Sequence, residues 1–426
     1  MKALVLFFTL ALGCFAESRT LTLKQAVALA LQQNPDVVIA RLDQQRARDQ
    51  RIIARDPFSP KVFANSGAAW TYGFPTSIEG EAPSIVQLRT SMSLFDRSQS
   101  YLVAGASESL RGAGFDVQTR QQEAAYRIAS LYLDAQNAGL SLAAAQREEE
   151  NLTRVQQYID ARVQEGRELA HESNKARVDV LRARQRVESL GLDLINAESS
   201  LALALGLAPG DQVRPAEEEP STLAVSVTED AAIEQILASS PEVKRLESNL
   251  QAKLLEEKSY KAQRLPKIDL VAQYALLAKY NNFQDFFARF QRNNVELGAA
   301  ISVPVLAGRS STAYAAQAQA DAEKVRVEIN RTRARITSDL RHAYQDVRRA
   351  ETARDLARAD LDLARDQISI DLAQMGEGRL PAAKTEQDRA VENEKWLALY
   401  EAETTLQHAQ LNVLHQTGSL LVALNR

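Results

Sequence analysis

Two long stretches of this 426-residue chain contain no proline, and they constrain its fold more than any other feature. The twelve prolines avoid residues 84–208 and 305–380. Between Gly308 and Gly376 there is no glycine either, across 67 consecutive residues. An interior proline removes a backbone donor and clashes with the preceding turn of a helix. The stretches therefore predict uninterrupted helices, the longest of them about 100 Å long at 1.5 Å per residue.

Apolar residues recur along the second stretch at mostly alternating spacings of three and four, which indicates a coiled-coil seam. Many of them are alanines, which allow helices to pack closely, and the other faces carry charged and amide side chains, as expected where one side meets water. The seam comprises Val325, Ile329, Ile336, Leu340, Ala343, Val347, Ala350, Ala357, Leu361, Ala364, Ile368, Leu372 and Met375.

Landmarks of the chain recur in the same order at nearly constant offsets of 206 to 212 residues, which predicts an internal duplication. The matching pairs include Asn34-Pro35 and Ser240-Pro241, Gly166 and Gly378, and Gly206 and Gly418. We place the first repeat at residues 17–208 and the second at 229–426. Residues 209–228, with three prolines and an acidic run, form the linker.

Each repeat is expected to hold a helix, a pair of strands and a long antiparallel helical hairpin. The first hairpin runs over residues 96–205 and turns near 165–170. The second runs over residues 309–417 and turns near 376–381.

The strand pairs are expected at residues 60–74 and 84–95, and at 266–280 and 293–306, where apolar and polar residues alternate. Aromatic residues collect in the same regions. Four such strands fit the wall of a transmembrane barrel, although a soluble sheet shows the same alternation. The long helices favour the transmembrane barrel over the soluble sheet.

Four strands cannot close a barrel, and an open edge in lipid leaves backbone groups unpaired. Two, three or four copies of the chain must therefore share the wall.

Residues 1–16 resemble a secretory signal peptide, with an early lysine, an apolar run and small residues before Glu17. Two fates are open for this segment. It is either cleaved after Ala16 or lipidated on Cys14, which follows a small residue as a lipidation signal requires. In both cases the mature chain leaves the cytoplasm.

Composition and motifs exclude several classes of function. A formal net charge of −4 gives no reason to expect a nucleic-acid partner, and a single cysteine excludes a multi-cysteine metal site. His408 and His415 are more typical of packed or solvated residues than of metal ligands, because no carboxylate stands in a register suitable for a shared metal site. The run Glu148 to Glu150 is expected to be a solvated face. No nucleophile elbow or phosphate-binding loop is present, so we expect neither an enzyme nor a cofactor.

The segment Leu21-Thr22-Leu23-Lys24-Gln25-Ala26-Val27-Ala28-Leu29-Ala30-Leu31-Gln32-Gln33-Asn34-Pro35 resembles the start of TolC-type outer-membrane efflux proteins. With the duplication, strand pairs and hairpins, the resemblance covers residues 21–420. It implies an α+β membrane protein that forms a homotrimer. A 12-stranded β-barrel, with four strands from each chain, would lie in outer-membrane lipid and continue as a 12-helix periplasmic α-barrel.

The same resemblance implies partners and site residues. The partners are a periplasmic adaptor and an inner-membrane transporter, and the turn residues Arg167, Leu169, Arg379 and Leu380 would face the adaptor. Gly166, Glu172 and Ala176 match the turn motif of the family. Some members place aspartates in constricting rings where this chain has Lys384 and Gln387. These two residues are therefore the candidate periplasmic constriction, without the negative charge that attracts cations.

The sequence thus predicts a passive outer-membrane channel of a tripartite efflux or secretion system, for small molecules or polypeptides. The alternative is a periplasmic structural or adaptor protein that uses coiled-coil hairpins without forming a pore.

Overall fold

The computed structural model describes residues 18–67, 84–208, 210–216, 227–278, 288, 291–305, 308–377, 379 and 382–424. The export segment with Cys14 lies outside the described residues. So do Leu380, most of the linker and the later part of the strand expected at residues 60–74.

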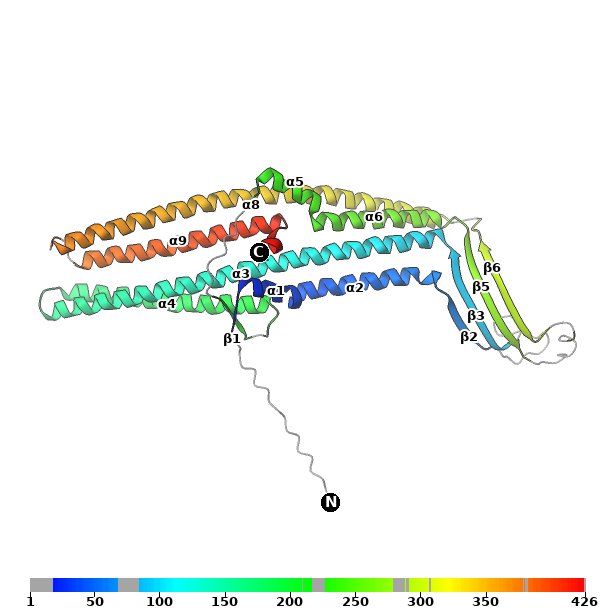
Figure 1. Cartoon of the computed structure of the whole chain (residues 1–426), viewed down its shortest axis with the longest axis horizontal. Coiled ribbons are helices and arrows are strands. Elements are labelled where there is room, and N and C mark those ends of the chain that lie inside the picture. The colour runs from blue at the N-terminus through cyan, green and yellow to red at the C-terminus, as the bar shows by residue number, and fades with distance from the viewer. Residues whose placement is uncertain are drawn as a thin grey trace, which may run out of the picture. The chain divides into compact units, whose positions relative to one another are not determined.

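Both halves of the chain contain, in the same order, two shorter helices, two strands and two long helices, with a few short elements that differ (Figure 1). The first half holds β1 (Ser18–Leu21), α1 (Leu23–Gln33), α2 (Pro35–Arg55), a short 3-10 helix (Asp56–Phe58), β2 (Lys61–Asn65), β3 (Ser84–Phe95), α3 (Arg97–Gln164), α4 (Ala170–Ala204) and β4 (Gln212–Pro215). The second holds α5 (Glu229–Ser239), α6 (Pro241–Ala262), β5 (Lys267–Leu277), β6 (Asn293–Ser302), α8 (Ser310–Gly376), α9 (Ala382–Gln416) and α10 (Leu420–Leu424). The long helices expected from the proline-free stretches are present, and the duplication itself stays a prediction.

The chain divides into two compact units, each of which takes residues from both halves. The first unit comprises Met1–Ile39, Gln118–Ser240 and Ala334–Arg426, and the second comprises Ala40–Val117 and Pro241–Arg333. Three boundaries fall within the continuous helices α2, α3 and α8, and the fourth, at Ser240–Pro241, falls between α5 and α6.

The first unit is organised around the break between α1 and α2. Thr22 and Gln25 form a capping box that starts α1. Asn34 ends α1 and is buried, at 4% exposure. Its Oδ1 accepts a hydrogen bond of 3.0 Å from the backbone N–H of Asp36 at the start of α2, and its Nδ2 donates one of 2.9 Å to the carbonyl of Ala204. One side chain therefore starts α2 and attaches it to the end of α4.

Gly206 makes the close approach at this contact possible. Its φ is +81°, a left-handed conformation that favours glycine. A Cβ at this position would lie 3.0 Å from the carbonyl oxygen of Gln33. Around the contact, β1 and β4 pair in parallel, and an apolar cluster forms from Ala26, Val27, Ala30, Ala125, Ile128, Ala129, Tyr132, Leu133, Leu201, Ala202, Ala204, Leu205, Val213, Leu411, Leu414 and Leu420.

The second unit carries an antiparallel four-stranded sheet in the order β2-β3-β5-β6 (Figure 1). The register places Lys61 opposite Ser91, Leu88 opposite Tyr274, and Lys267 opposite Ser302. The two edge strands, β2 and β6, are exposed at every position. Among the described residues, no helix is long and apolar enough to cross a membrane.

Substitution of Asn34 tests the contact between α1, α2 and α4. Asn34→Ala should lower the free energy of unfolding by about 1–3 kcal/mol, because it removes a helix cap and leaves a buried carbonyl without its donor. Asn34→Asp should also destabilise, because it keeps the cap but places two acceptors face to face. Gln33→Ala, at the exposed neighbouring position, is the control. Denaturant unfolding followed by circular dichroism measures all three, and equal stability of Asn34→Ala and Gln33→Ala would contradict the prediction.

Candidate functional site

The turn between α3 and α4 depends on a left-handed glycine. Gly166 has φ +69° and open space around it, so its backbone conformation rather than packing requires glycine. The backbone N–H of Arg167 donates to the carbonyl of Arg162 across the turn, at 2.9 Å. Arg167 pairs with Glu165 at 3.2 Å, and Leu169 is 72% exposed. The turn therefore presents a guanidinium and an apolar side chain to solvent.

The turn between α8 and α9 repeats this geometry where it is described. The N–H of Arg379 donates to the carbonyl of Gln374 at 2.9 Å, again five residues back, and its guanidinium pairs with Glu377 at 3.0 Å. Leu380, the fourth residue expected at the tips, lies outside the described residues. Of the other three, all are exposed, but no contact tests their expected role toward an adaptor.

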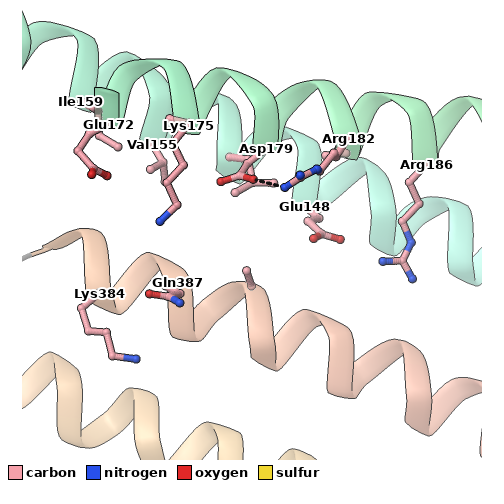
Figure 2. A pocket seen from close by; sticks show the side chains of 14 residues that line it. Glu148, Val155, Ile159, Glu172, Lys175, Asp179, Arg182, Arg186, Lys384 and Gln387 are labelled. Carbon is pink, nitrogen blue, oxygen red and sulfur yellow. Dashed lines mark hydrogen bonds and ion pairs between the residues drawn. The ribbon is translucent and has the colours of Figure 1, made fainter. Parts of the chain in front are cut away.

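A cavity of about 540 Å³ lies in the first unit between α3, α4 and α9. Its apolar wall consists of Leu152, Val155, Ile159, Ala176, Ala183 and Ala390. Its polar side chains are Glu148, Glu172, Lys175, Asp179, Arg182, Arg186, Lys384 and Gln387, of which Figure 2 shows Lys175 extending from α4 toward α9. The cavity has side chains of both charges beside a narrow apolar wall. It can therefore bind an amphipathic group or the charged surface of a helix.

Interhelical bonds hold the two walls of the cavity. Ser173 of α4 donates to Asp160 of α3 at 2.5 Å, and Arg184 pairs with Glu149 at 3.1 Å. On the other side, Lys395 of α9 pairs with Asp360 of α8 at 2.8 Å. Each hairpin is therefore cross-linked by polar contacts beside its apolar seam.

The acidic run at residues 148–150 is not the uniformly solvated face that the sequence predicted. Glu148 is half-buried in the cavity, and burial raises its pKa, while Arg186 lowers that pKa and Glu394 of α9 raises it. Glu149 pairs with Arg184 and is only 22% exposed. The prediction was wrong because it ignored the second helix of the hairpin, which covers this side of α3.

The structure brings together residues that the sequence singled out separately. Glu172 and Ala176 of the turn motif line the same cavity as Lys384 and Gln387, the candidate constriction. Lys384 donates to Asp388 at 2.6 Å, and Gln387 is exposed. Whether these two residues narrow a pore remains a prediction. The sequence analysis did not single out Lys175 and Asp179, although residues 172, 175, 176 and 179 have the spacing of one helix face.

The two C-terminal histidines contact α3. The Nε2 of His408 lies 2.9 Å from the Oδ1 of Asp134, a carboxylate on α3. Sequence could not reveal the pair because it joins helices far apart in the chain. His415 stacks on Tyr126 with ring centroids 4.5 Å apart, and burial lowers its pKa. Within the described ranges, no group of three His, Cys, Asp or Glu residues is arranged to hold a metal ion.

Comparison with known sequences gives one family. Residues 26–207 match the family model described as outer membrane efflux protein. This segment includes the Asn34 junction, α3, the Gly166 turn and α4. A search of curated proteins gave no match.

Comparison with solved structures gives outer membrane channels. The chain is similar to CusC, whose structures are described in connection with transmembrane channel formation, with a TM-score of 0.76, 15% identity, and coverage of 93% of this chain and 92% of that one. The CmeC outer membrane channel of Campylobacter jejuni matches with a TM-score of 0.73 and 16% identity, and the match covers 93% of this chain and 86% of that one. The MtrE outer membrane channel of Neisseria gonorrhoeae, in its open state, matches with a TM-score of 0.73 and 15% identity, and the match covers 93% of this chain and 89% of that one. At these identities the likeness establishes a TolC-like fold of long helices and short strands.

Replacement of Glu148 tests the electrostatics of the cavity. Its raised pKa means that ionisation costs more in the folded than in the unfolded chain, so this group reduces stability as the pH rises through that pKa. Glu148→Gln should therefore raise the unfolding temperature at about pH 8 and leave it nearly unchanged at about pH 4. Glu150→Gln, at the exposed end of the same run, is the control. A pH-independent effect of Glu148→Gln in thermal unfolding would contradict the assignment.

Proposed function

We propose that the chain is a member of the outer membrane efflux protein family, whose model matches residues 26–207, and that it acts as the outer-membrane channel of a tripartite efflux or secretion system. It is a non-enzymatic conduit located in the outer membrane, with a periplasmic extension. Energy for transport comes from an inner-membrane transporter, and the channel requires no cofactor.

The open four-stranded sheet carries this proposal. Within the described residues, β2 pairs with β3 alone and β6 with β5 alone, so both edges keep unpaired backbone groups. Such edges are unfavourable in lipid, where no water can pair them. Since the four strands alternate in direction, β6 of one copy and β2 of the next would meet antiparallel. Copies of this sheet can therefore close into a barrel without a change in pairing type.

Exposed apolar side chains on the helices support contact with further copies. Leu356, Leu363 and Ile370 recur every seven residues along α8 and are 66%, 70% and 49% exposed. A second exposed series lies on α4 and comprises Val178, Leu181, Leu192, Ile195 and Leu203. A heptad series is the pattern of a helix-packing seam, so both series suit interfaces that a single copy leaves open.

The number of copies is taken from the family resemblance. Three copies give a 12-stranded barrel and, with two hairpins each, a 12-helix barrel. The turns at residues 165–170 and 376–381 would then lie at the periplasmic end, with Arg167, Leu169 and Arg379 available to a periplasmic adaptor. The matching Glu165–Arg167 and Glu377–Arg379 pairs support equivalent roles for the two turns.

Oligomeric state and conductance test the channel directly. The protein purified from outer membranes should contain three copies by mass measurement in detergent or nanodiscs, and it should conduct ions in planar bilayers. Leu363→Glu should weaken the trimer, whereas Arg358→Glu should have less effect although it changes more charge, because Arg358 lies off the apolar series. A water-soluble periplasmic monomer without conductance would favour the non-pore coiled-coil alternative.

Cation block tests the constriction. With Lys384 and Gln387 in place of acidic rings, the channel should show weak block by divalent or trivalent cations from the periplasmic side, because charge rings set local selectivity. The double variant Lys384→Asp/Gln387→Asp should create strong block. Gln374→Asp, exposed on α8, is the control. Strong block of the unmodified channel would show that these residues do not form the constriction.

A further inference from the structure

Four junctions between a strand and a helix lie at one end of the β2-β3-β5-β6 sheet (Figure 1). The register of the strands places them there. Phe95, the last residue of β3, lies opposite Ile268 near the start of β5. Lys267, the first residue of β5, lies opposite Ser302 at the end of β6. All four junctions belong to the second unit of the chain, so their side chains share one rim of the sheet.

Every junction carries an exposed basic side chain. We call these side chains the junction rim, and they are Arg51, Arg55, Lys61, Arg97, Arg264, Lys267 and Arg309. The same segments, which are residues 51–61, 95–97, 264–269 and 302–309, contain three acidic residues, Asp56, Asp96 and Asp269. Positive charge is therefore in excess at this end of the sheet.

The acidic residues compensate the lysines rather than the arginines. Lys61 pairs with Asp56, and Lys267 pairs with Asp269 at 3.5 Å. The third carboxylate, that of Asp96, accepts a hydrogen bond of 2.9 Å from a backbone N–H in the first turn of α3 and caps this helix. The excess charge of the rim is therefore carried by its arginines.

Two of the arginines are held by neutral hydroxyl groups. The Nε of Arg97 donates to the hydroxyl of Tyr101 at 3.2 Å, and its guanidinium lies 5.0 Å from the centre of the same ring. The Nη2 of Arg264 donates to the hydroxyl of Thr312 at 2.5 Å. These contacts orient the guanidinium groups without cancelling their charge.

The other three arginines are free within the described ranges. Arg51 and Arg55 lie one turn apart on α2, and Arg309 directly precedes α8. None of the three forms a hydrogen bond or an ion pair with another described residue. Each of them can therefore bind an external anion at no cost in internal contacts.

Exposed apolar side chains stand beside these arginines. Ile52 and Ile53, between Arg51 and Arg55, are both more than 60% exposed, and Val305 is 89% exposed. Water is unfavourable for such side chains. A membrane surface suits both kinds of group, because acyl chains cover the apolar side chains while guanidinium groups reach the headgroups.

We propose that the junction rim binds the headgroups of anionic phospholipids in the periplasmic leaflet of the outer membrane. The inference rests on the proposed function, which places the sheet in that membrane and the helices in the periplasm. The planar guanidinium group matches two oxygens of a phosphate, and basic residues at a membrane surface attract anionic lipid. The bound headgroups would fix the depth of the sheet in the bilayer.

A further copy of the chain is a poorer partner for this surface. In a ring of identical copies, each neighbour presents the same arginines at the same level, so like charges would face one another. Anionic lipid supplies the opposite charge and also covers the apolar side chains.

Native mass spectrometry of the purified full chain tests the proposal. In detergent that contains equal amounts of phosphatidylglycerol and phosphatidylcholine with the same acyl chains, the protein should retain mainly phosphatidylglycerol. The variant Arg51→Gln/Arg55→Gln/Arg309→Gln should bind this lipid about fivefold more weakly for each arginine removed. Raising the salt concentration should reduce the preference of the unmodified protein, because salt screens charges.

A matched control removes the same charge elsewhere. Three exposed arginines on α8, each at least 20 residues beyond Arg309, form no hydrogen bond or ion pair with another described residue, and they are Arg331, Arg341 and Arg358. Their replacement by Gln should leave the lipid preference unchanged. Equal retention of the two lipids by the unmodified protein, or an equal loss in both triple variants, would overturn the proposal.

Two further outcomes separate this proposal from the others. Loss of the oligomer in the rim variant, but not in the control variant, would assign the rim to a contact between copies and refute lipid binding. A protein that conducts ions but shows no preference for phosphatidylglycerol would overturn the lipid site alone. A water-soluble monomer without conductance would instead overturn the proposed function.

Discussion

The close packing of small side chains along the long helices is the interaction on which the rest of the structure depends. On α8 the buried residues include Ala315, Ala318, Ala322, Leu340, Ala343 and Ala350. Alanine contributes little buried area, but it lets helix backbones approach closely and loses no side-chain entropy on burial. Polar contacts such as Asp160–Ser173 and Asp360–Lys395 then flank the seam. Two helices of unequal length can thus remain paired without a thick hydrophobic core.

A narrow seam also explains why a single copy is an incomplete structure. The apolar series on α4 and α8 stays exposed because each hairpin buries only one stripe of each helix. The sheet has the same property, since its edge strands are exposed throughout and its backbone groups are unpaired at both edges. In the proposed channel, identical copies associate around one axis. This association covers the exposed apolar series and pairs the free sheet edges at the same time.

Near the turns, charged side chains supplement the apolar packing. The cavity between α3, α4 and α9 collects Glu172, Lys175 and Lys384, and Lys384 donates to Asp388 on the same helix. Buried polar groups of this kind are sensitive to pH and to the loss of one partner.

The sequence by itself determined the elements. Missing prolines fixed the long helices, Asn34-Pro35 fixed the break between α1 and α2, and Gly166 marked a turn, because each of these signals acts on the local backbone. The three-and-four spacing identified the α8 seam as far as Ile368 for the same reason, but Leu372 and Met375, which the sequence placed at its end, are exposed. What only the tertiary structure decided is where the polar side chains lie: Asn34 on the carbonyl of Ala204, His408 beside Asp134, and Glu148 in the cavity. These contacts depend on the register and rotation of one helix against another. Outside their apolar seams these helices carry many charged residues, so several alternative pairings look equal in sequence until packing selects one.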